Sequence, residues 1–420
     1  MRIAFLLGSL NRGGTETMLL DMFRNAEKNH LDVIGIYRKS GTLETDFIES
    51  GVSMQKLSYQ KNILHYLFRL RKILLSNKIF IIHAQQPIDA LYAWLACMGT
   101  GIKIILTFHG YNFSERKLSN FILRFIIRRT DRNIYVSYTQ LEYYQHTYNL
   151  KPNKQDVVYN GISFKKFDAD GIQSKRIDYQ VNHIDDSSIK ARTDSTNNES
   201  DLHLHPQVTI REELHLSKTT ILLGSVGNFV PGRDPKTLCR FLKLLKNQDV
   251  QFHFVFIGKR SESAPHLYDT CVNYCEQNYL SEQVTFLGSR NDVPFLLQQL
   301  DAFVYSTDHD TFGIAVVEAM AVGIPVFVND WAVMSEITGQ GKYATLYTTK
   351  DEQDLLQKFM LFMQNKPVFK AKAIEAAGYV RERYSIEKHI ETLMAIYKTV
   401  ISEEPPAPEG EEEKRRTPDP

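Results

Sequence analysis

Cysteine is scarce in this sequence: its 420 residues contain only four, at Cys97, Cys239, Cys271 and Cys275. So few thiols, irregularly spaced, argue against a disulfide framework and favour a reducing compartment. Cys271 and Cys275 lie four residues apart with His266 nearby, but the sequence has no further ligands at the spacing of a zinc site. We therefore expect ordinary buried cysteines and no metal site.

Long hydrophobic runs are missing too. No stretch reaches the roughly 18 to 20 apolar residues that a membrane-spanning helix needs. The segment 1–14 has a short apolar run that enters a glycine turn without a small-residue cleavage site, so it does not read as a signal peptide. The net charge is only +1, which gives the whole chain no general attraction for nucleic acid. We expect a cytoplasmic protein, either soluble or held peripherally on the inner face of the plasma membrane.

What the sequence does contain is a repeated alternation of short apolar runs and amphipathic stretches. Over about the first 165 residues this pattern predicts βαβ units and a parallel sheet covered by helices. The expected strands are Ile3–Leu7, Val33–Tyr37, Ile79–His83, Ile104–Thr107, Asn133–Val136 and Asp156–Tyr159. The expected helices are Thr17–Lys28, Ile63–Ser76, Ile88–Cys97, Leu118–Arg128 and Tyr138–Thr147.

The alternation stops in a polar stretch and then resumes, which predicts a second α/β domain. We expect an N-terminal domain at 1–167, a disordered linker or insertion at 168–206, and a second domain at 207–383. A helix at 384–402 and a disordered, proline- and charge-rich tail at 403–420 complete the chain. Two doubly wound domains would enclose a cleft, with ligands beyond the carboxyl ends of the strands.

The segment 310–325 carries the most information about function. Ile314 and Val317 fall at helical spacing, and Gly313 stands just before them, where backbone N–H groups could approach a phosphate. Glu318 lies about one turn into this helix among apolar neighbours, a costly place for a carboxylate without a partner. A ribose diol would supply such a partner. An ordinary amphipathic helix with a solvated Glu explains the local pattern equally well.

The same segment resembles the signature of retaining glycosyltransferase family 4, which reads Glu-x-Phe-Gly, four residues, Glu-Ala-Met-Ala and then Gly-x-Pro. Here Asp310 takes the place of the first Glu, and Glu318 is the second acid. The resemblance implies the GT-B fold, two Rossmann-like domains facing across a cleft. It also implies a catalytic Asp310 beside the donor sugar and Glu318 on the ribose. The donor-site residues implied in this segment are Asp310, Phe312, Gly313, Ile314 and Glu318.

A second segment, 227–233, follows an expected strand and precedes a helix. Its Arg233 could hold a diphosphate bidentately; a surface Arg in a turn is the other interpretation. The family usually has an Arg and a Lys here. By the resemblance, Asn228 replaces the Arg and Arg233 replaces the Lys, so Arg233 carries most of the catalytic stabilisation of the leaving diphosphate.

Two N-terminal features complete the resemblance. Gly13 and Gly14 follow the first expected strand, and they match the family's glycine loop, which faces the donor phosphates and the acceptor. His109 follows another strand, where the family places a His close to the reacting sugar, so we expect it to be catalytic. Glu336 fits an acid that the family has after its Gly-x-Pro strand, without an assigned role.

One pattern points to different chemistry. Asp308-His-Asp310 matches the acidic motif that binds a metal and a diphosphate in the other main glycosyltransferase fold. That motif belongs in an early single domain, whereas here it directly precedes the Phe-Gly helix. We therefore expect a metal-independent enzyme with no required cofactor.

Positive charge is concentrated in the N-terminal half. Residues 55–135 contain thirteen Lys and Arg against three acids, a local charge of about +10 (13 − 3). Within it, 114–132 mixes basic residues with Phe121 and Phe125. This suits docking on anionic lipid, while a core-packed helix with a solvated basic rim is the plainer explanation.

Together these features predict a glycosyltransferase that moves a hexose-type sugar from a UDP- or GDP-sugar to a saccharide or lipid-linked saccharide, with retention of configuration. Two alternatives stay open. A nucleotide-sugar epimerase of the same fold would need extra acid/base carboxylates at the donor. A non-catalytic sugar-nucleotide-binding protein would bind without turnover.

Overall fold

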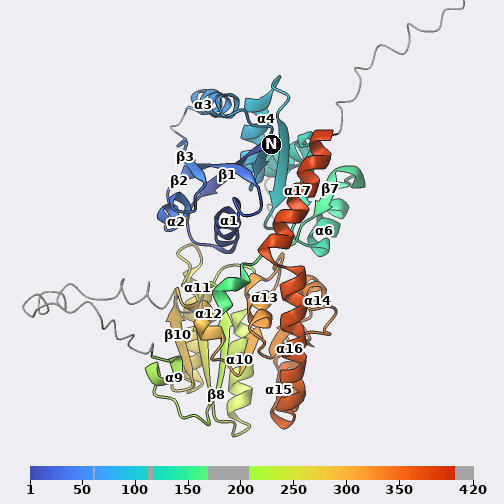
Figure 1. The fold of residues 1–420 in the computed structure, drawn as a ribbon. Coiled ribbons are helices and arrows are strands. Elements are labelled where there is room, and N and C mark those ends of the chain that lie inside the picture. The colour runs from blue at the N-terminus through green and yellow to red at the C-terminus, as the bar shows by residue number, and fades with distance from the viewer. Residues whose placement is uncertain (60–61, 112–116, 169–207, 403–420) are drawn as a thin grey trace, which may run out of the picture.

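The computed structural model describes residues 1–59, 62–111, 117–168 and 208–402. They form two α/β domains, with the N-terminal domain above the C-terminal one in Figure 1. The predicted pair of doubly wound domains is confirmed, since each contains one parallel sheet flanked by helices. The predicted insertion at 168–206, beyond Asp168, and the tail at 403–420 lie outside the described residues.

The N-terminal sheet has seven strands in the order β3-β2-β1-β4-β5-β6-β7, all paired in parallel. Its strands are β1 (Arg2–Ser9), β2 (Asp32–Lys39), β3 (Ser53–Lys56), β4 (Ile81–Ala84), β5 (Lys103–Phe108), β6 (Arg132–Tyr135) and β7 (Gln155–Val157). Its helices are α1 (Gly14–Arg24), α2 (Glu44–Ile48), α3 (Ile63–Ser76), α4 (Pro87–Cys97), α5 (Lys117–Arg129) and α6 (Tyr138–Tyr148). The strand order reverses between β1 and β4.

The C-terminal sheet has six parallel strands in the order β10-β9-β8-β11-β12-β13, and its order reverses between β8 and β11. Its strands are β8 (Ile221–Val226), β9 (Phe252–Ile257), β10 (Val284–Gly288), β11 (Ala302–Tyr305), β12 (Val326–Asn329) and β13 (Thr345–Tyr347). Its helices are α9 (Ile210–Glu213), α10 (Pro235–Lys246), α11 (Pro265–Gln277), α12 (Val293–Leu297), α13 (Ile314–Ala321), α14 (Ala332–Ile337), α15 (Glu352–Gln364) and α16 (Lys366–Arg383).

Most expected elements are confirmed to within two residues, because their apolar periodicity is strong. The unexpected ones are short or weakly patterned. β3 reads Ser-Met-Gln-Lys, and β13 has only three residues. α16 is long, but its apolar residues are spread around the helix instead of along one face. Expected α1 at Thr17–Lys28 begins and ends earlier, with Asn25 as its C-cap.

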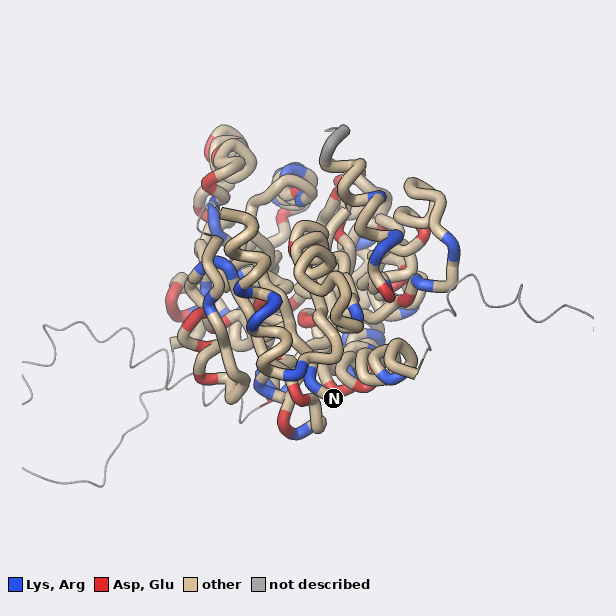
Figure 2. Tube along the Cα trace, turned by 90° about the horizontal axis from the view of Figure 1, so that it is seen from above, with Lys and Arg blue, Asp and Glu red and all other residues tan. Residues whose placement is uncertain are grey.

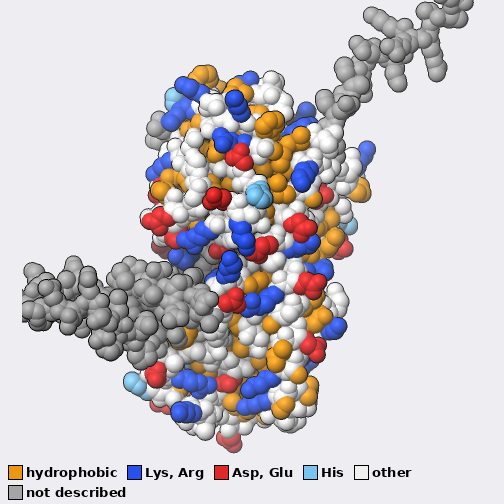
Figure 3. Space-filling view, viewed as in Figure 1, with side chains coloured by type: hydrophobic (Ala, Val, Ile, Leu, Met, Phe, Trp, Pro, Cys, Tyr) orange, Lys and Arg blue, Asp and Glu red, His pale blue; other side chains and the backbone are white. Residues whose placement is uncertain are grey.

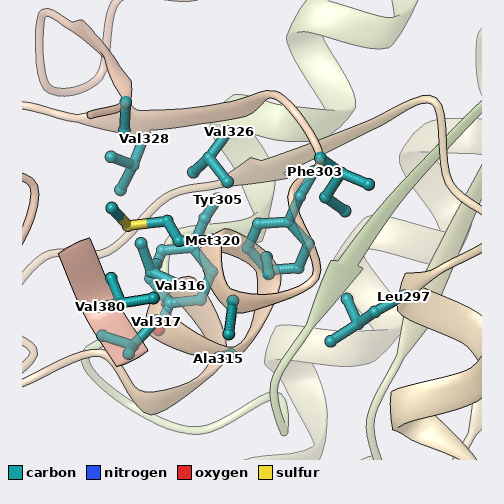
Figure 4. Close-up of a cluster of buried hydrophobic side chains, with 14 of the residues drawn as sticks. Leu297, Phe303, Tyr305, Ala315, Val316, Val317, Met320, Val326, Val328 and Val380 are labelled. Atoms are coloured by element: carbon teal, nitrogen blue, oxygen red, sulfur yellow. The ribbon is translucent and has the colours of Figure 1, made fainter. Parts of the chain in front are cut away.

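Helix α13 is packed into the C-terminal core on nearly all sides. Val316, Val317 and Met320 are fully buried against strand residues such as Val328 (Figure 4). Gly313 precedes the helix in the left-handed region with φ 83°. A Cβ there would lie 2.7 Å from Cε of Met334, so both the backbone and the space favour glycine.

Two segments cross between the domains. The last helix, α17 (Ile386–Ser402), runs up along the N-terminal domain (Figure 1), where Ile390 and Tyr397 join the core that contains β1. The short 3₁₀ helix η2 (Phe164–Phe167) runs the other way, and Phe164 and Phe167 are buried in the C-terminal core. The segment that follows each domain in the sequence is therefore packed into the core of the other domain.

The basic helix α5 packs on the N-terminal core through Leu123, Ile126 and Ile127. Its Phe121 is 68% exposed. Figure 2 shows Lys and Arg positions on several elements seen from above, with acidic positions among them. In the part of the chain that the structure describes, no helix is both long and apolar enough to span a membrane.

Candidate functional site

Two hollows lie at the carboxyl ends of the strands, where both sheets reverse their strand order. The first, which we name the interdomain cleft, has a volume of about 620 Å³ and draws on both domains. The second, the N-terminal pocket, has about 690 Å³ and lies within the N-terminal domain. Crevices at such switch points are where open α/β sheets bind ligands.

Helix α1 separates the two hollows. Gly14, Thr17, Met18 and Asp21 line the interdomain cleft, while Glu16 lines the N-terminal pocket. The residues of α1 that line the interdomain cleft are spaced three and four apart, so they share one face of the helix, and Glu16 lies on another face.

The glycine loop brings the two domains into contact at the cleft. A Cβ on Gly14 would lie 3.1 Å from Cδ1 of Ile314, the first residue of α13. The N-termini of α1 and α13 therefore adjoin, and helix N-termini attract anions. Gly13 and Gly14 of the N-terminal domain thus lie together with Ile314 of the C-terminal domain at the cleft.

Glu318 faces the interdomain cleft with its side chain 13% exposed. Its Oε1 accepts a hydrogen bond from Nζ of Lys166 at 2.7 Å. The same Nζ lies 3.8 Å from Oδ2 of Asp21. Burial by itself would lower the pKa of Lys166, but attraction to Glu318 and Asp21 outweighs it and raises that pKa. The amine is therefore a cation shared by an acid from each domain.

Arg233 also lines the cleft, and Asp310 holds it in place. Nη1 of Arg233 donates to Oδ2 of Asp310 at 2.8 Å, and the hydroxyl of Tyr305 donates to the same oxygen at 2.7 Å. The guanidinium lies 4.9 Å from the centre of the Tyr305 ring. The Asp310 carboxylate is thus engaged by Arg233 instead of lining the cleft, and its expected contact with the donor sugar stays a prediction.

Further cations line the interdomain cleft. Arg290 is held by Asp292 and Glu213, so much of its charge is neutralised. Arg12 and Lys259 form no ion pair with another described residue. Figure 3 shows basic and acidic side chains side by side at the level where the domains meet. Cations of this kind favour an anionic ligand.

The other expected donor-site residues differ in their access. Asn228 lines the cleft, and its Oδ1 accepts from the backbone N–H of Lys259. Phe312 is 1% exposed and packs against Tyr159 and Tyr384, so its side chain belongs to the core. Gly313 acts through its left-handed turn, which starts α13.

His109 lines the N-terminal pocket and is not among the residues that line the interdomain cleft. Its Nε2 is 2.8 Å from Oε1 of Gln85, and its Nδ1 has no partner among the described residues. Burial, with a smaller effect of His389, lowers the pKa of His109 to about 3. The imidazole is therefore neutral near pH 7 and can exchange hydrogen bonds but carries no charge.

Glu16 shares this pocket, and burial raises the pKa of its carboxyl. Around it stand apolar side chains, among them Ile88, Phe108 and Ile122. The pocket thus combines a few polar groups with an apolar wall, which suits a ligand with both kinds of surface.

The acidic motif of 308–310 does not converge on one point. Asp308 pairs with Lys350 at 3.2 Å, whereas Asp310 pairs with Arg233. Among the described residues, no group of three or more His, Cys, Asp or Glu side chains could hold a metal ion. Four buried cysteines carry free thiols.

Several cleft residues were not expected from the sequence: Arg12, Asp21, Lys166, Lys259 and Arg290. Lys259 and Arg290 each stand two residues after the end of a strand, β9 and β10, so their position beyond strand ends was a usable signal. A Cβ on Gly258 would lie 2.1 Å from the carbonyl oxygen of Gly227, which shows how close these strand ends approach. No comparable sequence signal marks Lys166, because its position in the cleft depends on how η2 crosses between the domains.

Comparison with known proteins agrees with this architecture. A family profile described as Glycosyltransferase Family 4 matches residues 12–166, and one described as Glycosyl transferases group 1 matches residues 207–381. The two profiles thus cover one domain each.

Among curated proteins, N-acetyl-alpha-D-glucosaminyl L-malate synthase of Bacillus anthracis is 22% identical over 346 residues, 80% of this chain and 79% of that protein. UDP-Gal:alpha-D-GlcNAc-diphosphoundecaprenol alpha-1,3-galactosyltransferase of Escherichia coli is 22% identical over 335 residues, 76% of each chain.

Among solved structures, a glycosyltransferase from Rickettsia africae superposes with a TM-score of 0.77 at 14% identity, covering 96% of this chain and 99% of that one. HepE of Anabaena, in complex with UDP and glucose, has a TM-score of 0.75 at 16% identity, covering 95% and 100%. At these identities the structures show the shared fold. The chain belongs to glycosyltransferase family 4 with the GT-B fold, and it is a glycosyltransferase.

Proposed function

We propose that this enzyme transfers a hexose-type sugar from a UDP- or GDP-sugar to a hydroxyl group of a growing polysaccharide or glycolipid, with retention of configuration. The observation that carries the donor assignment is the interdomain cleft, which is lined by a largely buried carboxylate and by several cations. Glu318 suits a ribose diol, and Arg233 suits a diphosphate. A nucleoside diphosphate has both groups.

The positive charge has a clear chemical use. When the bond to the sugar breaks, negative charge develops on the departing diphosphate. Arg233, Lys259 and the adjoining N-termini of α1 and α13 would stabilise that charge in a place prepared beforehand. In the front-face mechanism that the family resemblance implies, the same diphosphate accepts the proton of the acceptor hydroxyl.

The N-terminal pocket suits the acceptor. Its polar groups, including Glu16 and His109, can exchange hydrogen bonds with saccharide hydroxyls, and its apolar wall can take an apolar portion. The name of the Escherichia coli relative specifies a lipid-linked saccharide. We extend that class of acceptor to this chain, and we place the enzyme at the cytoplasmic face of the membrane.

Replacing Glu318 with Ala tests the donor assignment. Loss of hydrogen bonds to a charged group costs about 1.5–3 kcal/mol, so we expect the KM for the donor to rise roughly ten- to hundredfold. The measurement is transferase activity on a saccharide acceptor, with the donor chosen by a thermal-shift screen over UDP- and GDP-sugars. A ligand at about 100 times its Kd adds about 2.7 kcal/mol of stability, which the screen would detect.

The matched control is Glu375→Ala, an exposed helical Glu on α16 away from both hollows. Unchanged kinetics in the Glu318→Ala enzyme would refute the site assignment. Product analysis separates a transferred sugar from an epimerised donor, and donor binding without turnover on any acceptor would leave only a binding protein.

Metal independence is tested separately. We expect activity to persist after dialysis against EDTA, because side-chain cations supply the positive charge at the cleft. Loss of activity in EDTA and its recovery with Mg²⁺ or Mn²⁺ would show that a metal takes part.

A further inference from the structure

Lys166 occupies a position that neither the sequence motifs nor the proposed chemistry explains. It lies on η2, between two phenylalanines that anchor this short helix in the C-terminal core. Its side chain lines the interdomain cleft, with 14% of its surface exposed. A long, flexible side chain held in this way loses most of its rotamer freedom, so its contacts must compensate for that cost.

Those contacts are two carboxylates that belong to different domains. Glu318 on α13 is 2.7 Å from Nζ, and Asp21 on α1 is 3.8 Å away. The carboxylates of both Asp21 and Glu318 line the same cleft. One ammonium group therefore offsets the repulsion between two acids that the closed domains bring together.

The geometry at Glu318 leaves part of the carboxylate available. Lys166 donates to Oε1. No described residue donates to Oε2, and the residue lies on the cleft wall. An ionised carboxylate can accept several hydrogen bonds. A hydrogen bond from a cation to one carboxylate oxygen fixes the direction in which the second oxygen points, and the carboxylate stays ionised.

We propose that Lys166 is a positioning residue: its ammonium group holds Glu318 so that the second carboxylate oxygen meets the ribose of the donor. This inference rests on the proposed nucleotide-sugar donor and goes further, because it assigns the orientation of the carboxylate that recognises the ribose to a cation on the crossing segment. Since Lys166 also reaches Asp21 on α1, ribose recognition is strongest when the two domains are closed.

The test compares ribose with 2′-deoxyribose. The Kd values of UDP, GDP and their 2′-deoxy forms are measured by calorimetry for the wild type and for Lys166→Met, Lys166→Arg and Lys165→Met. Lys165 is the neighbouring residue on η2 and is exposed, so Lys165→Met controls for the loss of one positive charge on this segment.

We expect the wild type and Lys165→Met to prefer the ribonucleotide about tenfold or more, as a hydrogen bond to a charged group implies. In Lys166→Met the preference should fall to about threefold or less, and Lys166→Arg should restore most of it. If Lys166 had a merely structural role, its replacement would weaken the binding of both nucleotides equally and leave the ratio of their Kd values unchanged.

The outcomes separate the two proposals. If the wild type prefers the ribonucleotide and a folded Lys166→Met protein keeps the same ratio, the role of Lys166 is refuted while the donor assignment stands. If the wild type binds none of the four nucleotides, both are refuted. If Lys166→Met does not fold, Lys166→Gln retains a polar end group in this buried position, and an unchanged ratio there refutes the proposal.

Discussion

At the scale of single residues, the departure of Asp310 from the family pattern has a structural counterpart. The carboxylate of Asp310 accepts from both Arg233 and Tyr305. It therefore holds the guanidinium group that lines the cleft. A positioning role through Arg233 and a direct contact with the donor sugar make different predictions for a pair of substitutions.

We expect Asp310→Asn to lower kcat about tenfold or more, because misplacing an electrostatic stabiliser costs transition-state energy. If Asp310 acts through Arg233, the double variant Asp310→Asn, Arg233→Met should have a kcat no lower than that of Arg233→Met alone. The reason is that the effects of substitutions at contacting residues are not additive. The measurement is kcat for the four enzymes of this cycle. Independent, multiplied losses would instead indicate that Asp310 acts directly on the donor sugar.

At the scale of elements, the two domains are joined by a helix cap that crosses between them. Glu336, on α14 of the C-terminal domain, accepts from the backbone N–H groups of Tyr138 and Thr139 at the start of α6. It also accepts from the hydroxyl groups of Thr139 and Tyr159. A carboxylate at a helix N-terminus satisfies free donors and complements the helix dipole.

This contact predicts that Glu336 stabilises the closed arrangement. Glu336→Ala should lower the free energy of unfolding by about 1–3 kcal/mol, and Glu336→Gln, which keeps one acceptor oxygen, should lose less. The measurement is the thermal midpoint of both variants, with small-angle scattering to follow the separation of the domains. An alanine variant with the wild-type midpoint and scattering would show that the cap contributes little.

At the scale of the whole molecule, positive charge is unevenly distributed between the domains. The thirteen cations and three acids of residues 55–135 stand in a chain whose net charge is only +1. On α5, Phe121 is exposed beside the exposed Arg124 and Arg128. The helix is anchored by its buried face, so any membrane contact would use its outer rim.

We expect the enzyme to sediment with liposomes that contain anionic lipid and to dissociate as salt is raised, because screening shortens to about 3 Å at 1 M. Each well-placed cation contributes about 1 kcal/mol to the free energy of binding to an anionic membrane. The double variant Arg124→Glu, Arg128→Glu should therefore clearly reduce the fraction of enzyme that sediments with the liposomes. Neutral liposomes are the control. No sedimentation with anionic liposomes at low salt would contradict membrane docking by this face.

Local pattern was enough to predict most of the fold. Strong apolar periodicity predicted the helix α3 at its observed ends. The short edge strand β13 and the helix α16 were missed, because neither has an apolar pattern of its own and both depend on what they pack against. The signature around Glu318 likewise pointed to the cleft, since strand ends and helix starts meet there.

The sequence by itself determined the two α/β domains, the glycine turns and the presence of Glu318, Arg233 and Asp310, because these follow from spacing along the chain. Only the tertiary structure decided which of these groups meet. Asp310 lies on Arg233, and Lys166 lies between Glu318 and Asp21, over separations of 77, 152 and 145 residues (310 − 233, 318 − 166, 166 − 21). The Asp310–Arg233 pair depends on how the C-terminal domain folds and the contact of Lys166 with Asp21 on how the two domains meet, and no local periodicity encodes either.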